Sequence, residues 1–116
     1  MTTRDRLFLF APGFEDGPGT SWFCPFSAKV EGLLKYEPRL ELAVDVHRIA
    51  FPKPRQALVD LLGESLQSCP MLVLAEAHAN HPDAQRSDAT GRAYISDTDR
   101  ILDYLAVTHG TPRPHP

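Results

Sequence analysis

The stretch Cys24-Pro25-Phe26-Ser27-Ala28-Lys29-Val30 decides the fold class, because it opens a helix soon after a strand and a loop. Pro25 suits the first position of a helix. Apolar residues then recur at the spacing of one helix face, at Phe26, Val30, Leu33 and Leu34. Pro38 ends this helix. Because the helix begins at Pro25, Cys24 falls at its N-terminal cap, beside unpaired backbone N–H groups.

Apolar runs on either side of this helix predict four strands, at residues 6–10, 42–49, 71–74 and 93–95. Pro54 predicts the start of a second helix, and Ser96 is a candidate cap for a third. The polar segment 77–92 has no periodicity and predicts a long loop. The resulting order, β-α-β-α-β-β-α, predicts an α/β fold with a small mixed sheet, helices on both faces and the first two strands parallel.

Composition limits the classes of function. A chain of 116 residues with 42% apolar residues predicts one domain, over residues 1–110, with 111–116 as a frayed tail. A net charge of -3 gives no electrostatic attraction to nucleic acid, so no such partner is expected. The apolar run that ends at Phe10 is too short for a signal peptide or a membrane span, which predicts a cytoplasmic protein with no membrane partner. The cytoplasm is a reducing compartment, so both cysteines would remain thiols.

Three motifs resemble the thioredoxin-like superfamily, of the glutaredoxin and glutathione-transferase N-terminal type. The stretch from Cys24 to Val30 is similar to the first helix of dehydroascorbate reductases, omega-class-like glutathione transferases and intracellular chloride channel proteins. Cys69-Pro70-Met71-Leu72 resembles their entry to the third strand, and Asp97-Thr98 resembles the acidic pair that opens their last helix. The chain as a whole is most similar to short bacterial thioredoxin-like proteins of unknown function.

The resemblance implies a glutaredoxin-type fold with a cis-proline at Pro70 and a catalytic pair, Cys24 and Ser27. It also implies glutathione contacts at Cys24, Pro25, Phe26, Cys69, Pro70, Asp97 and Thr98. Cysteines at helix N-termini have pKa values of about 3.5–7.5, against about 8.5 for an ordinary cysteine. The position of Cys24 is therefore typical of a reactive thiolate.

Ser27 stands where dithiol oxidoreductases have a second cysteine. A mixed disulfide at Cys24 would then need an external thiol such as glutathione, and an alternative hypothesis makes Cys69 the resolving residue. We therefore predict a glutathione-linked thiol–disulfide protein. If it is an enzyme, its class would be a monothiol glutaredoxin-like oxidoreductase. It would need no cofactor beyond glutathione as co-substrate and would act on small thiol or disulfide substrates.

Other hypotheses remain open. The chain would alternatively be a non-catalytic adaptor that meets a protein partner through residues 77–92 or its tail, or would share an iron–sulfur cluster between two copies through Cys24 and glutathione. No metal site is expected, because His78 and His81 have no evident carboxylate or thiol to complete a set. Basic residues at Lys29, Lys53 and Arg55 would attract the carboxylates of glutathione.

Overall fold

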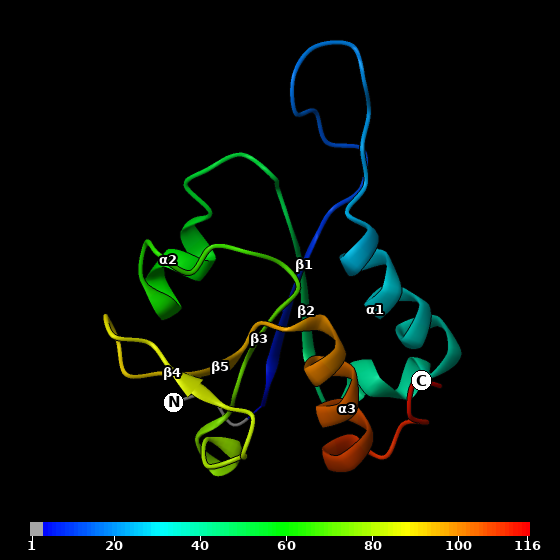
Figure 1. The fold of residues 1–116 in the computed structure, drawn as a ribbon, viewed down its shortest axis with the longest axis vertical. Helices are drawn as coiled ribbons and strands as arrows, with labels where there is room; N and C mark the ends of the chain where they lie inside the picture. The colour runs from blue at the N-terminus through cyan, green and yellow to red at the C-terminus, as the bar shows by residue number, and fades with distance from the viewer. Residues whose placement is uncertain (1–3) are drawn as a thin grey trace.

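A computed structural model describes residues 4–116 and shows a five-stranded sheet flanked by helices (Figure 1). The strands, in sheet order, are β2 (Asp45–Ile49), β1 (Arg6–Phe10), β3 (Met71–Val73), β5 (Ala93–Ile95) and β4 (Gln85–Arg86). The α-helices are α1 (Pro25–Tyr36), α2 (Gln56–Leu62) and α3 (Thr98–His109). Two 3-10 turns complete the fold: η1 (Pro38–Leu42), between α1 and β2, and η2 (Glu76–His78), between β3 and β4.

The sheet is mixed. β1 pairs with β2 in parallel, with Phe8 opposite His47, and pairs with β3 in the antiparallel sense, with Phe8 opposite Met71. The β3–β5 and β5–β4 pairs are antiparallel as well. The structure thus confirms the predicted α/β class, the mixed sheet and the parallel arrangement of the first two strands.

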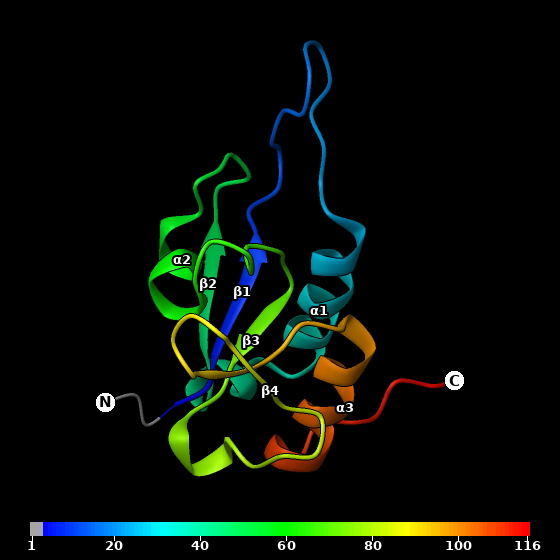
Figure 2. The same cartoon turned by 60° about the vertical axis from the view of Figure 1, so that its left-hand side comes forward.

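Helices cover both faces of the sheet (Figure 2). Leu7 and Leu9 of β1 share one apolar core with buried residues of α1 and α3. Phe8, between them in sequence, belongs to a second core with Leu58 and Leu62 of α2. Because successive side chains of a strand point to opposite faces, residues 7–10 of β1 are all apolar and buried on both sides of the sheet.

Four local predictions are wrong: three concern where an element begins, and the fourth concerns elements within a predicted loop. β2 begins at Asp45 and not at Leu42, because Pro38 starts a 3-10 turn whose anchor is the buried Leu40. Pro54 precedes α2 and does not open it. Asp97, rather than Ser96, caps α3 with its carboxylate. The segment 77–92, expected to be a loop, contains the end of η2 and the short strand β4.

The helices are short. The longest, α1 and α3, have 12 residues each, whereas crossing a bilayer takes about 20. Among residues 4–116, no helix has the length and apolar character needed to cross a membrane. The cytoplasmic location stays a prediction.

Candidate functional site

The three sequence motifs meet at one end of the sheet, the end at which β1 finishes. The chain reaches Cys24 through the loop that follows β1. β3 runs antiparallel to β1 and therefore starts at this same end, directly after Pro70. β5 runs antiparallel to β3 and ends there at Ile95, two residues before Asp97. Residues far apart in sequence are thus brought to one end of the sheet, as the resemblance of the three motifs implies.

Cys24 is the N-cap of α1. Its backbone is extended, and its Sγ accepts a hydrogen bond from the backbone N–H of Ser27 at 3.4 Å. Its side chain is partly exposed, and Pro25 follows at the first helical position. The sulfur therefore lies where the N-terminal backbone dipoles of the helix favour negative charge, and it remains within reach of a reagent.

Ser27 is buried, with 2% of its surface exposed. Its Oγ accepts a hydrogen bond from the backbone N–H of Phe10 at 3.1 Å. This contact joins the first turn of α1 to the last residue of β1. Ser27 therefore fixes the position of the helix that carries Cys24, and its predicted catalytic role stays a prediction.

Cys69 and Pro70 lead into β3. Their peptide bond is cis, as the resemblance implies, and Pro70 is buried. Burial raises the pKa of the Cys69 thiol to about 12, although Arg55 nearby acts in the opposite direction and Cys24 adds to the rise. At neutral pH, Cys69 is therefore a protonated thiol and a poor nucleophile.

Asp97 and Thr98 form the start of α3. The Asp97 side chain accepts a hydrogen bond from the backbone N–H of Arg100 at 3.0 Å, and it is exposed. Asp99, in the first turn of α3, forms a 2.7 Å ion pair with Lys29 of α1. Lys29 is thus engaged with α3, which removes it from the predicted basic rim and links the two helices of the site.

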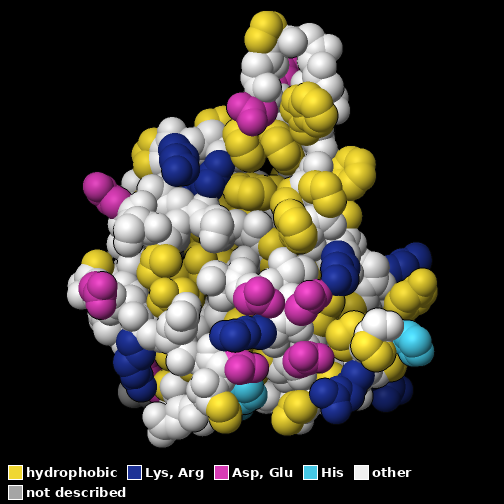
Figure 3. Space-filling model, in the orientation of Figure 1, with side chains coloured by type: hydrophobic (Ala, Val, Ile, Leu, Met, Phe, Trp, Pro, Cys, Tyr) yellow, Lys and Arg dark blue, Asp and Glu magenta, His cyan; other side chains and the backbone are white. Residues whose placement is uncertain are grey.

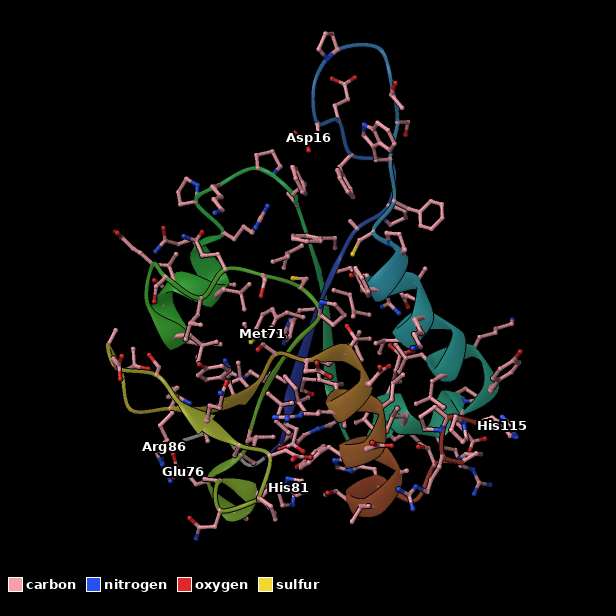
Figure 4. The ribbon with its side chains drawn as sticks, in the orientation of Figure 1. Asp16, Met71, Glu76, His81, Arg86 and His115 are labelled. Carbon is pink, nitrogen blue, oxygen red and sulfur yellow. The ribbon has the colours of Figure 1, made fainter. Side chains whose placement is uncertain are left out.

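An aromatic pocket adjoins Cys24. It has a volume of about 400 Å³, and Asp16, in the loop between β1 and α1, is its one acidic residue (Figure 4). The exposed fractions of Trp22, Phe23 and Phe26 are 49%, 62% and 61%. The pocket is lined by Phe10, Phe14, Trp22, Phe23, Pro25, Phe26 and Phe51, together with Cys24 and Asp16. Exposed aromatic groups gathered in this way mark a binding surface, and Figure 3 shows hydrophobic side chains concentrated at this end of the molecule.

Arg55 packs on two residues that line the same pocket, Phe10 and Phe51, and no sequence pattern predicts these contacts. Its guanidinium lies 4.5 Å from the ring centre of Phe10 and 4.8 Å from that of Phe51. It donates hydrogen bonds to the backbone carbonyls of Phe51 and Gln67, at 2.6 and 2.8 Å. A fixed cation therefore lies beside Cys69, held by aromatic faces and by a loop twelve residues away in sequence.

A family model described as "Protein of unknown function (DUF3088)" matches residues 4–113. The chain belongs to this family. No curated protein and no solved structure matches it. The DUF3088 match covers all the site residues described above, and its description supplies no activity.

The Ser27 hydroxyl should contribute measurably to the stability of this DUF3088 protein. Replacing Ser27 with alanine leaves the buried N–H of Phe10 without its acceptor, which costs about 1–3 kcal/mol. We expect urea titration of Ser27→Ala to show that loss in the free energy of unfolding. Ser96→Ala is the control, because Ser96 is exposed, and should change it by less than about 0.5 kcal/mol. Equal stability of the two variants would contradict the anchoring role.

Proposed function

We propose that this protein is a thioredoxin-like domain of glutaredoxin type that catalyses glutathione-linked thiol–disulfide exchange through Cys24. The observation that carries the proposal is the partly exposed Cys24 sulfur at the N-terminus of α1, which accepts a backbone N–H. The order of strands and helices, with β4 as an addition, supports the fold. The meeting of Cys24, Cys69-Pro70 and Asp97-Thr98 at one sheet end supports the site.

The reaction has two exchange steps. In the first, the Cys24 thiolate attacks the glutathione sulfur of a mixed disulfide between glutathione and a second thiol. The sulfur–sulfur bond to that second thiol breaks, its thiolate leaves and takes a proton from water, and Cys24 becomes glutathionylated. In the second, the thiolate of another glutathione attacks the bound glutathione sulfur. Oxidised glutathione leaves, and the Cys24 thiolate is restored.

An external thiol fits the second step better than a thiol of this chain. Ser27 offers a hydroxyl that is already bonded to Phe10. Cys69 has its pKa raised to about 12 by burial, so it is almost entirely protonated at neutral pH. The mixed disulfide at Cys24 would therefore be resolved by glutathione.

The surroundings of Cys24 offer complementary contacts for such a substrate. The N-terminus of α3, with Asp97 and Thr98, suits the charged γ-glutamyl end of glutathione, since backbone N–H groups bind a carboxylate and Asp97 would accept the ammonium. The aromatic pocket on the other side of the thiol would hold the organic part of the leaving thiol. This combination favours mixed disulfides that carry an apolar or aromatic group.

The test is reduction of a mixed disulfide between glutathione and thionitrobenzoate, which releases a coloured aromatic thiolate. With excess glutathione, the protein should accelerate the release, Cys24→Ser should abolish the acceleration, and Cys69→Ser should retain it. Phe23→Ala should raise KM for this substrate more than it lowers kcat, because the ring supplies binding and no chemistry. A rate that is unchanged by Cys24→Ser would overturn the proposal.

The exposed aromatic side chains also favour a second candidate, a non-catalytic domain that binds a protein partner at the same end. Trp22, Phe23 and Phe26 are rigid side chains of the kind that anchor protein interfaces. No turnover with the chromogenic disulfide, together with an intact fold, would favour this candidate over the catalytic one.

A further inference from the structure

A second cluster of chemically active side chains lies at the opposite end of the sheet from Cys24. Asp5 directly precedes β1, His78 is the last residue of η2, and His109 is the last residue of α3. Figure 2 shows η2 and the C-terminal part of α3 at the end of the molecule away from the β1–α1 loop. The proposed thiol chemistry makes no use of these residues.

The two imidazoles converge on one carboxylate. His78 Nδ1 lies 3.0 Å from Asp5 Oδ1 and 3.2 Å from Oδ2, and His109 Nε2 lies 3.0 Å from Oδ2. The three donor atoms all lie within 4.8 Å of one another. Segments of the chain that are 73 and 104 residues away from Asp5 are therefore brought together at a single point.

Two other groups hold the Asp5 carboxylate in place. The backbone N–H of Ala75 donates to Oδ1 at 2.8 Å, and the hydroxyl of Tyr104 donates to Oδ2 at 2.5 Å. Asp5 itself is fully buried, and Tyr104 is 1% exposed. Outer hydrogen bonds that orient a carboxylate ligand in this way are a regular part of protein metal sites.

We propose that Asp5, His78 and His109 bind a divalent transition-metal ion such as Zn²⁺, with water in the remaining position. Two imidazole nitrogens and one carboxylate oxygen are a donor set that such ions accept. In a tetrahedral site with bonds of about 2.0–2.1 Å, neighbouring donors are about 3.3–3.5 Å apart. The histidine–carboxylate separations of 3.0–3.2 Å would need to widen by a few tenths of an ångström, and the two imidazole nitrogens lie within 4.8 Å of each other.

The site has both an entrance and a protected interior. The side chain of His78 is 34% exposed, whereas those of His109 and Asp5 are 11% and 0% exposed. An ion and its water would therefore approach past His78. For binding, each imidazole must turn a lone pair toward the ion, so a neutral ring carries its proton on the other nitrogen and a charged ring releases one.

The test is a zinc titration of the full chain, without an affinity tag, in the Cys24→Ser/Cys69→Ser variant. This background removes the two thiols, which would otherwise compete for zinc. Equilibrium dialysis should find one Zn²⁺ per chain, and the Tm should rise with zinc concentration, because an ion that binds only the folded state stabilises it. Co²⁺ should give the absorption bands of a site with nitrogen and oxygen ligands.

Variants then locate the site. His78→Ala changes a partly exposed residue, so it should fold and should weaken zinc binding at least tenfold. His109→Gln should do the same, whereas His81→Ala is the matched control and should leave the affinity unchanged. His81 lies in the same segment, with its ring 4.9 Å from that of Tyr104, and is not one of the three donors. Zinc binding that is absent, or that both His78→Ala and His109→Gln leave intact, would overturn the proposal and leave a purely hydrogen-bonded cluster.

Discussion

Replacing Asp5 with alanine should lower the free energy of unfolding of the metal-free protein by about 3–5 kcal/mol, the largest loss expected for a polar residue in this chain. The carboxylate is fully buried and is the common acceptor for His78, Tyr104 and the backbone of Ala75. Without it, these donors would lose the acceptor that they share. Chemical denaturation in the presence of a chelator measures the loss independently of any bound ion.

The charge of Asp5 is part of this effect. Burial alone would raise the pKa of Asp5, but hydrogen bonds from three side chains and one backbone amide outweigh burial and hold that pKa well below its usual range. The carboxyl group is therefore ionised at neutral pH. Asp5→Asn keeps the shape but turns an amide N–H₂ toward groups that are themselves donors, so it should also destabilise the fold by at least about 2 kcal/mol.

Asp99→Ala is the matched control for Asp5. Its ion pair with Lys29 is short, at 2.7 Å, but the two side chains are 74% and 52% exposed. Exposed ion pairs contribute less than about 1 kcal/mol, so Asp99→Ala should change stability by no more than that. If Asp5→Ala were no more costly than Asp99→Ala, the buried cluster would have no structural role.

The cluster around Asp5 shows what the sequence could not reveal. His78 and His81 attract attention as a spaced pair and stay close through a backbone hydrogen bond, yet it is His78 with Asp5 and His109, and not with His81, that forms the cluster of donor atoms. Periodicity and motifs report neighbours along one element. They carry no signal for a contact between a strand end, a short 3-10 turn and a helix C-terminus, since that contact depends on how the elements pack.

More of the fold than of this cluster can be predicted from the sequence. The strand at residues 6–10 has the predicted bounds, and the first helix begins at Pro25 and ends before Pro38 as predicted, because a continuous apolar run and a proline-opened helix face are strong local signals. That Cys24, Cys69 and Asp97 meet at one end of the sheet is implied by the resemblance of the three motifs, and not by the predicted element order alone. Arg55 is different. The sequence predicts its basic character, but its place beside the rings of Phe10 and Phe51 depends on the path of the loop after β2.

The two cysteines should differ strongly in reactivity, and this is the second large effect that we expect. At pH 7.5, iodoacetamide should alkylate the single-cysteine variant Cys69→Ser, which retains Cys24, about 100-fold faster than Cys24→Ser, which retains Cys69. A thiol with a pKa of about 12 is ionised to only about one part in 10⁴–10⁵ at this pH, against roughly a tenth for an ordinary cysteine. The greater intrinsic nucleophilicity of the more basic thiolate recovers part of that difference, which leaves about two orders of magnitude.

The alkylation rate of Cys69 should also depend on pH in a definite direction. Because burial raises the pKa of Cys69, its thiolate fraction, and so its alkylation rate, should rise about tenfold per pH unit from 7 until it levels off near 12 or until the protein unfolds. In denaturant the two variants should react at similar rates, since the difference arises from folded surroundings. If folded Cys69 instead reacted within tenfold of Cys24 at pH 7.5, it would be nucleophilic enough to attack a disulfide at Cys24. Resolution within the chain would then replace the external thiol in the proposed reaction.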